Sequence, residues 1–203
     1  MALALGLALA IQAWVVKPYQ IPSESMEPTL DVGQRVLVNR FIYHLNDPSI
    51  GDIIVFHPPE GTEELSPGGG ECGEHPKRGY ACDKPTEAEA GDNFVKRLVA
   101  GPGDHVRVIN GRAIVNGEES SAANGAANES CGPPLPRSQW SSVQPDEHCN
   151  FPNTIVVPPD HYFMMGDNRA NSDDSRFWGP IPKSWIIGEA FATYWPPDRI
   201  GTL

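Results

Sequence analysis

Two serines stand close together in a segment bounded by prolines, Ile21 to Leu30 (Ile-Pro-Ser-Glu-Ser-Met-Glu-Pro-Thr-Leu). A serine hydroxyl acts as a nucleophile only when a neighbouring base activates it. In a turn, Ser23 and Ser25 could instead bond nearby backbone groups and do no chemistry. The segment is therefore either a turn or part of a reactive site, and its own residues do not decide between the two.

A lysine interrupts an otherwise strand-like pattern at Asn93 to Val99 (Asn-Phe-Val-Lys-Arg-Leu-Val). Successive side chains of a strand point to opposite faces, so Lys96 shares a face with Phe94 and Leu98. A lysine between apolar neighbours either extends its amine to water from an edge strand or has a functional role. Both interpretations of Lys96 stay open at this point.

A dense polar run, Met165 to Arg176, lies between two apolar stretches (Met-Gly-Asp-Asn-Arg-Ala-Asn-Ser-Asp-Asp-Ser-Arg). Its Asp and Asn residues are typical of a solvated loop or of a calcium site. The histidines add no catalytic pattern, since none occurs in His-Glu-x-x-His or beside a Gly-x-Ser-x-Gly turn. We interpret all six as surface or loop residues: His44, His57, His75, His105, His148 and His161.

The composition favours a turn-rich β protein as the scaffold for these groups. Gly and Pro supply 20 and 21 of the 203 residues. Together they make up about a fifth of the chain, well above their usual combined share of about 12%, which disfavours long helices. Hydrophobic residues make up 39% of the chain, enough for a core. The formal net charge is −11 and no Lys/Arg run occurs, so we expect no nucleic-acid partner.

Segments rich in β-branched and aromatic residues, bounded by Gly and Pro, predict the strands. Alternating apolar residues around Asn110-Gly111, in residues 105–116, predict a β-hairpin. Strands do not alternate with helical patterns, which disfavours a doubly wound parallel sheet. Residues 58–91 and 117–152 lack periodicity and are interpreted as inserted loops. The other predicted strands are Arg35–Ile42, Asp52–His57, Asn93–Ala100, Thr154–Val157, Tyr162–Met165 and Ile187–Thr193.

All four cysteines fall within the two inserted loops. Sequence-local disulfides, Cys72 with Cys82 and Cys131 with Cys149, are the simplest of the three pairings that four cysteines allow. Such staples would each contribute about 2 to 4 kcal/mol and imply an oxidising compartment. The alternative is a zinc site built from Cys72, His75, Cys82 and a distant fourth ligand such as Cys149. Paired Cys-x-x-Cys motifs are absent from the sequence, so we expect no metal.

The first sixteen residues, Met1 to Val16, carry no charge. As a helix they would span about 24 Å, slightly less than a hydrocarbon core of about 30 Å. Trp14 and Lys17 are typical of membrane-interface residues. A secretory signal peptide lacks support, because no basic residue precedes the run and no small-x-small site follows. A buried core helix is the third interpretation, and we expect a membrane anchor whose leading residues lie outside this sequence.

Taken together, the polar segments and the apolar start resemble the bacterial type I signal peptidases, or leader peptidases. In that family an apolar anchor precedes four boxes in a fixed order. Here they read Pro-Ser-Glu-Ser-Met-Glu-Pro-Thr-Leu (22–30), Gly-Asp-Ile-Ile-Val (51–55), Phe-Val-Lys-Arg-Leu-Val-Ala-Gly-Pro-Gly-Asp (94–104) and Gly-Asp-Asn-Arg-Ala-Asn-Ser-Asp-Asp-Ser-Arg-Phe-Trp-Gly (166–179). Each box alone is weak, but their order across nearly the whole chain is specific.

The resemblance implies a fold, a location and an activity. It implies a mainly β, antiparallel catalytic domain with few short helices, preceded by one transmembrane helix, so that residues 1–16 form the anchor and residues 17–203 the domain. Lys17, Arg35 and Arg40 follow the anchor, and by the positive-inside rule alone would place the domain in the cytosol. The cysteines and the resemblance argue for the extracytoplasmic side of the cell membrane. The expected partners are membrane lipid and exported preproteins, whose signal peptides the enzyme removes without cofactor or metal.

The resemblance also assigns roles to residues. Ser25 would be the nucleophile and Lys96 the general base, with the Ser23 hydroxyl and the Ser25 backbone N–H forming the oxyanion hole. Ser172 would position the lysine amine. Asp174, Arg176 and Asp167 would hold the site in shape, while the shallow pockets for small residues at −1 and −3 of the substrate would be lined by Ile21, Pro22, Phe94 and Val95. Ala170 stands where an acidic residue is expected, which puts only a supporting contact in doubt.

Elementary acid–base chemistry sets a condition on Lys96. An exposed lysine has a pKa of about 10.4, so only about 1 in 2,500 is neutral at pH 7. Burial beside apolar groups such as Phe94 and Leu98 would have to lower that pKa by several units. A nearby carboxylate would raise it, so Asp174 is expected to pair with Arg176 and not with Lys96.

Two other classes of protein remain open from the sequence. One is an extracytoplasmic β-rich binding or scaffold domain in which the serine and the lysine meet by coincidence. The other is a relative with the same chemistry and a different task, such as a self-cleaving repressor or a peptidase that processes pilins or conjugation factors. A repressor would need a DNA-binding domain before the protease, and none precedes Lys17 in this sequence.

Overall fold

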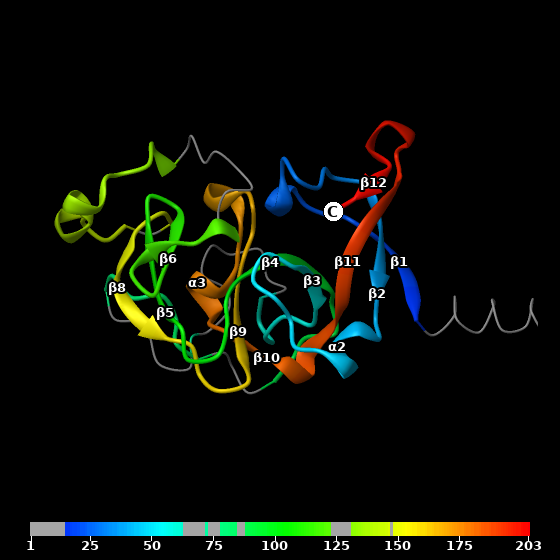
Figure 1. The fold of residues 1–203 in the computed structure, drawn as a ribbon, viewed down its shortest axis with the longest axis horizontal. Coiled ribbons are helices and arrows are strands. Elements are labelled where there is room, and N and C mark those ends of the chain that lie inside the picture. Colours follow the sequence, from blue (N-terminus) through cyan, green and yellow to red (C-terminus); the bar gives the residue numbers. More distant parts are fainter. Residues whose placement is uncertain (1–14, 63–71, 73–77, 85–87, 123–130, 147) are drawn as a thin grey trace, which may run out of the picture.

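Two antiparallel sheets make up most of the described chain (Figure 1). The structure is a computed structural model that describes residues 15–62, 72, 78–84, 88–122, 131–146 and 148–203. In these residues every ladder between named strands is antiparallel. The expected mainly β architecture with few short helices is therefore confirmed.

The larger sheet has the strand order β1-β2-β11-β3-β4-β9-β10, and β12 pairs with β11. The central position of β4, between β3 and β9, matters for the site because β4 carries Lys96. Its strands are β1 (Val16–Gln20), β2 (Arg35–Asn39), β3 (Ile53–Phe56), β4 (Phe94–Ala100), β9 (His161–Met165), β10 (Ile181–Pro182), β11 (Ile186–Trp195) and β12 (Gly201–Thr202).

The smaller sheet has the order β7-β6-β5-β8. The predicted hairpin forms its centre, and Asn110 and Gly111 both have positive φ, 46° and 72°, as the tight turn between β5 and β6 requires. Its strands are β5 (His105–Ile109), β6 (Arg112–Val115), β7 (Glu118–Glu119) and β8 (Phe151–Val156).

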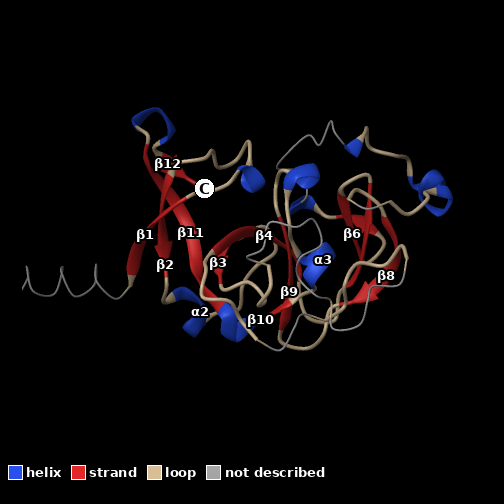
Figure 2. Ribbon diagram, turned by 180° about the vertical axis from the view of Figure 1, so that it is seen from behind, coloured by secondary structure: helices blue, strands red, loops and turns tan. Residues whose placement is uncertain are grey.

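All helices of the described residues are short. The α-helix α3 packs on β9 and lies between the two sheets when the molecule is seen from either side (Figure 2). The helices are α2 (Ile42–Leu45) and α3 (Ser175–Trp178), together with the 3-10 turns η1 (Glu24–Met26), η4 (Arg137–Ser142), η5 (Arg169–Asn171), η6 (Lys183–Trp185) and η7 (Pro197–Arg199).

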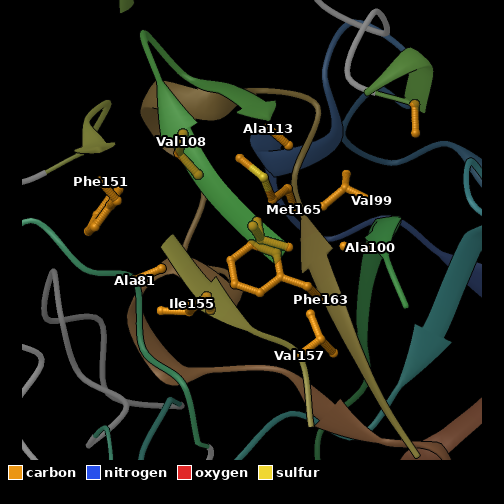
Figure 3. Packing of buried hydrophobic residues seen from close by; sticks show 12 residues of the cluster. Ala81, Val99, Ala100, Val108, Ala113, Phe151, Ile155, Val157, Phe163 and Met165 are labelled. Atoms are coloured by element: carbon orange, nitrogen blue, oxygen red, sulfur yellow. The ribbon is translucent and has the colours of Figure 1, made fainter. Parts of the chain in front are cut away.

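Apolar side chains from both sheets meet in one buried cluster. Figure 3 shows Val99 of β4 and Phe163 and Met165 of β9 packed with Val108 of β5 and Ile155 of β8. A second cluster lies under the serine segment and includes Ile21, Met26, Leu30, Val36, Val38, Ile53, Val55, Val95 and Ala190. Burial of such side chains contributes about 1.5 to 3 kcal/mol each, so both faces around β4 are firmly held.

Some predicted strand boundaries are wrong. The strand expected over Arg35–Ile42 ends at Asn39, because the Asn39 side chain accepts hydrogen bonds from the backbone N–H groups of Phe41 and Ile42 at 3.0 and 3.2 Å. This contact starts α2. The strand expected from Thr154 instead begins at Phe151, since β8 is an edge strand and accommodates Pro152.

The predicted anchor, residues 1–16, lies outside the described residues except for its last two. Val16 begins β1, an edge strand that tolerates Pro18 and pairs with β2. In the part of the chain that the structure describes, no helix is long and apolar enough to cross a bilayer.

The four cysteines form two disulfides, Cys72–Cys82 and Cys131–Cys149. These are the sequence-local pairs that the spacing suggested. Zinc needs free thiolates as ligands, so the alternative metal site around Cys72, Cys82 and Cys149 is not supported. His75, its other suggested ligand, lies outside the described residues.

Candidate active site

The segment between β1 and β2 places Ser25 over the core. Ile21 bonds across to Gln34, and Gly33 donates its N–H to the carbonyl of Ile21 at 2.8 Å, which closes the segment into a loop. Met26 and Leu30, buried in the cluster below, fix η1 from underneath. As a result Ser25 is 8% exposed, at the bottom of an open cleft.

Lys96 reaches the same cleft from β4. It is only 4% exposed, and its amine lies 5.4 Å from the centre of the Phe94 ring. Because β4 is flanked on both sides by other strands, extension of the amine to water from an edge strand is excluded. Lys96 Nζ instead donates a hydrogen bond to Ser25 Oγ at 2.6 Å. The topology thus joins two side chains that are 71 residues apart in sequence.

Burial lowers the pKa of Lys96 to about 8. The carboxylates of Asp174 and Asp173 act in the opposite direction, and the Arg176 guanidinium adds to the lowering. A pKa of about 8 leaves roughly a tenth of the amine neutral at pH 7, which meets the condition set for a base. In the described residues Lys96 forms no ion pair.

Asp174 and Arg176 form a fully buried pair behind the lysine. Arg176 Nε and Nη2 donate to the two carboxylate oxygens of Asp174 at 2.7 and 2.8 Å. Burial alone would raise the pKa of Asp174, but the guanidinium and the N–H of Gly166 hold it below its usual range. Asp174 therefore pairs with Arg176 as expected, and it also caps the N-terminus of α3.

Ser172 lies beside the pair, but its bond differs from the expected one. Its hydroxyl donates to Asp174 Oδ2 at 2.8 Å, and no hydrogen bond joins it to Lys96. The carboxylate is a stronger acceptor than any neutral group nearby, so it takes the hydroxyl proton. Ser172 thus links the Asp174–Arg176 pair to the cleft, where it is a lining residue.

Arg176 also connects the site to both disulfides. The backbone N–H of Cys82 donates to the Arg176 carbonyl at 3.0 Å. Arg176 Nη1 donates to the carbonyl of His148, the residue before Cys149, at 2.6 Å. The inserted loops therefore support the site from behind, although nothing in their sequence pattern indicated this.

Asp167 braces the loop after β9 against β4. Arg97, the residue after Lys96, donates to both of its carboxylate oxygens at 2.8 and 2.6 Å. Asp167 and Asp174 are thus each neutralised by an arginine, so the calcium interpretation of this run is not supported. Arg97 points away from Lys96 by strand alternation, so the brace holds β4 without charging the amine.

Sequence reasoning missed three residues that hold the serine. The Asn168 N–H donates to the Ser25 carbonyl at 3.0 Å, and the side chains of Asn168 and Asn171 donate to Glu24. Gly166 passes so close to Ser25 and Ser172 that a Cβ there would overlap both. All three residues lie in the polar run. No local pattern in the sequence indicates which residues of that run contact Glu24, because Glu24 is more than 140 residues away.

The cleft has a volume of about 840 Å³. Ser23 is at its exposed rim and donates a hydrogen bond to Ser25 Oγ at 3.2 Å. The four residues expected to line substrate pockets all face this cleft: Ile21, Pro22, Phe94 and Val95. The structure therefore brings these residues together with Ser25, Lys96 and Ser172.

A serine hydroxyl hydrogen-bonded to a buried amine in an open cleft is typical of a hydrolase that forms a covalent intermediate. Comparison with known proteins gives the family. A family model described as signal peptidase, peptidase S26, matches residues 1–195. The chain therefore belongs to the signal peptidase family, peptidase S26, and is a serine-type endopeptidase.

Three relatives, each at least 33% identical and covered to more than two thirds of its own length, support this family assignment. A signal peptidase I of Leptolyngbya laminosa is 36% identical over 201 residues, which cover 99% of this chain and 79% of that protein. A probable signal peptidase I-1 of Synechocystis sp. is 36% identical, covering 98% and 82%. A signal peptidase I of Pseudomonas aeruginosa is 33% identical, covering 98% and 72%. A solved signal peptidase I from Enterococcus faecalis aligns with a TM-score of 0.38 at 20% identity, covering 71% of this chain and 97% of that one.

Proposed function

We propose that this protein is a membrane-anchored endopeptidase that removes N-terminal signal peptides from exported preproteins by a Ser25–Lys96 dyad, cutting after small residues at −1 and −3. The observation that carries the proposal is the 2.6 Å contact between Lys96 Nζ and Ser25 Oγ in a cleft. Membership of the signal peptidase family supports the substrate class.

The first half of the reaction is acylation. Neutral Lys96 accepts the Ser25 hydroxyl proton as Ser25 Oγ attacks the scissile carbonyl, and a tetrahedral oxyanion forms. The Ser25 backbone N–H and the Ser23 hydroxyl donate to that oxyanion, each contributing about 3 to 4 kcal/mol. Lys96 then gives its proton to the leaving amine, so the mature chain departs and the signal peptide stays as an ester on Ser25.

The second half is hydrolysis of this ester. Lys96, neutral again, takes a proton from a water molecule that attacks the ester carbonyl. Collapse of the second oxyanion returns the proton to Ser25 Oγ and releases the signal peptide with a free carboxyl group. The surroundings of Lys96 are kept fixed by Asp174, Arg176 and Ser172. Because Arg176 holds the Asp174 carboxylate, that carboxylate does not contact the lysine amine.

Substrate choice follows from the shape of the cleft. Ile21 and Val95 are buried against the core and cannot retreat from a bulky residue. Shallow apolar pockets between Ile21, Pro22, Phe94 and Val95 would therefore accept only small side chains at −1 and −3. A signal peptide in a bilayer presents its cleavage site near the surface, so an anchor at residues 1–16 would keep Ser25 close to it.

The location is the extracytoplasmic side of a cell membrane, with membrane lipid beside residues 17–203. Two disulfides support this location, because such bonds persist in oxidising compartments. The domain boundaries follow from the same proposal: an anchor over residues 1–16 and a catalytic domain over residues 17–203.

The test of this function is the position of the cut. A purified preprotein with an Ala-x-Ala site is incubated with the detergent-solubilised protein, and the masses of the products are measured by mass spectrometry. We expect one new N-terminus directly after the second Ala. Phe at −1 or −3 should abolish cleavage, whereas Phe at −2, the matched control, should not. Cleavage elsewhere, or equal tolerance of Phe at all three positions, would contradict the proposal.

A further inference from the structure

One acidic residue of the cleft has no role in the mechanism. Asp173 lies between Ser172 and Asp174 and lines the cleft together with Ser25 and Lys96. It comes from the loop after β9, whereas the proposed pocket residues Ile21, Pro22, Phe94 and Val95 come from the serine segment and from β4. Asp173 therefore lines the cleft from a different segment of the chain than the proposed pockets.

The Asp173 carboxyl group lacks a partner. Its Oδ1 atom is shielded from water, yet within the described part of the chain neither oxygen accepts a hydrogen bond or joins an ion pair. The two fully buried aspartates of this loop, Asp167 and Asp174, are each held by an arginine. A shielded carboxylate oxygen without a donor is costly, so an occupant of the cleft that supplied a donor to Oδ1 would be favoured.

The charges around Asp173 leave that donor to the substrate. Burial and the neighbouring Asp174 raise the pKa of Asp173 to about 6 against the opposing charges of Lys96 and Arg176, so the group is mostly ionised at pH 7.5. The other ionisable residues that line the cleft are Glu24, Asp92, Lys96 and His148. Lys96 is committed to Ser25, and no arginine lines the cleft in the described residues.

We propose that Asp173 is a specificity-determining residue that accepts a charge-assisted hydrogen bond from a lysine or arginine side chain of the preprotein next to the scissile bond, and that disfavours glutamate or aspartate there. The inference rests on the proposed function and deepens it. Hydrogen bonds between ionised partners are about twice as strong as neutral ones, and a second carboxylate at the same place would be repelled.

The geometry of an extended peptide narrows the position of that side chain. Successive side chains of an extended chain point to opposite sides. With −1 and −3 in the apolar pockets beside Ile21 and Val95, the side chains at −2 and +1 point away from those pockets. The cation that meets Asp173 therefore comes from −2 or from +1.

The experiment compares preprotein peptides that carry Lys, Ala or Glu at −2 or at +1, each cut at pH 7.5 by the wild type and by Asp173→Asn. We expect the wild type to prefer Lys over Glu by about tenfold in kcat/KM at one of these positions, the ratio that about 1.4 kcal/mol gives. Asp173→Asn should reduce the ratio to within about twofold. A ratio taken within one variant cancels any change in Lys96 basicity.

The matched control is Asp92→Asn, which removes the same charge from an exposed cleft residue and should keep the preference. If both variants lost the Lys-over-Glu preference equally, the preference would come from the overall charge of the cleft and not from Asp173, and the inference would be overturned. A wild-type ratio near one at both positions, with the Ala peptide cut normally, would overturn it too and leave the proposed function intact. Failure of the wild type to cut the Ala peptide would instead remove the proposed function.

Discussion

In the proposed mechanism Lys96 is the base, and its surroundings prepare the buried amine for that role. Its neighbours are apolar on one side, where the Phe94 ring lies, and ionic on the other, where Asp174 is neutralised by Arg176. Loss of the Arg176 guanidinium or of the apolar cover would raise the pKa of Lys96, so that more of the amine would be charged. The pKa of about 8 is therefore a property of the surroundings and sets the pH range in which the dyad can work.

The first prediction at this scale is the pH profile. The base must be neutral, and its pKa is lowered to about 8, so activity is present above that pH and is lost as pH falls through it. We expect kcat/KM to fall about tenfold per pH unit below pH 7. Measurement of kcat/KM from pH 5.5 to 10 on a peptide without ionisable groups tests this. A flat profile over that range would contradict the role of Lys96.

The second residue-scale prediction concerns Ser23. Among the described residues, its exposed hydroxyl bonds only Ser25, so Ser23→Ala should leave thermal unfolding unchanged. As an oxyanion donor it should nevertheless contribute about 100- to 1,000-fold to kcat. Steady-state kinetics beside a thermal melt separates the two effects. A kcat within twofold of wild type would exclude the Ser23 hydroxyl from the oxyanion hole.

The sequence predicted much of the site at the level of residue types, and less at the level of contacts. The alternation of side chains correctly placed Lys96 on the same face as Phe94. The burial of Lys96 could not be predicted from the sequence, because it depends on the central position of β4 in the sheet. The partner of Ser172 was misjudged, because whether its hydroxyl faces Lys96 or Asp174 depends on the rotation of one side chain. Asp173 gave no signal at all within a run so rich in polar residues.

At the scale of elements, the loop after β9 is clamped onto the serine segment. Gly166, Asn168 and Asn171 all contact the turn that contains Glu24 and Ser25. The loop in turn is fixed to β4 by Asp167 and to α3 by the Asp174 cap. Three segments far apart in sequence are thus held in one register around the cleft.

This clamp gives the third prediction. A Cβ at residue 166 would overlap Ser25 and Ser172, so Gly166→Ala should lower kcat/KM by about 100-fold, the loss expected for a shift of about 1 Å. Overpacking should also destabilise the fold by about 1 to 3 kcal/mol. Gly201→Ala is the control, since nothing lies within 4 Å of a Cβ there. Equal activity of the two variants would show that the clamp is not tight.

The prediction of strands succeeded where the local sequence pattern determines the structure. It failed where a segment becomes a strand only by pairing with a distant part of the chain. The Asn110-Gly111 hairpin formed as expected because its turn chemistry is local. β1 was not predicted, because its residues follow an apolar run and contain Pro18, and only pairing with β2 makes them a strand. The two-residue strands β10 and β12 likewise exist only through their partners.

Across the whole molecule, exposed apolar side chains gather at the end of the large sheet nearest the serine segment. Trp195, Ile200 and Leu203 are 50%, 65% and 43% exposed. Arg199 bonds Asp31 and the Pro28 carbonyl, which ties this end to the residues just after Ser25. Figure 1 shows β12 and the C-terminus beside the serine turn. Apolar surface of this kind is expected where a protein meets a membrane.

The fourth prediction is lipid binding by this end. A fragment that begins at Val15, so that β1 stays intact, should bind detergent micelles or zwitterionic vesicles in co-sedimentation. Replacement of Trp195, Ile200 and Leu203 by Ser should remove most of the binding. The same change at Phe41 and Leu45, exposed apolar residues on α2 and its N-cap, is the control and should have little effect. A fragment that stays monomeric and free of lipid and detergent would contradict this surface assignment.

The measurement that tests the account most directly is preprotein cleavage by wild type, Ser25→Ala, Lys96→Met and the double variant, with Lys183→Met, a lysine bonded to Asp47 outside the cleft, as control. Residues that act as one unit are not additive. We therefore predict that both single variants and the double variant fall to the same low residual rate while the control cleaves normally. Persistent cleavage at the Ala-x-Ala site by a folded Lys96→Met or Ser25→Ala protein would contradict the Ser–Lys dyad.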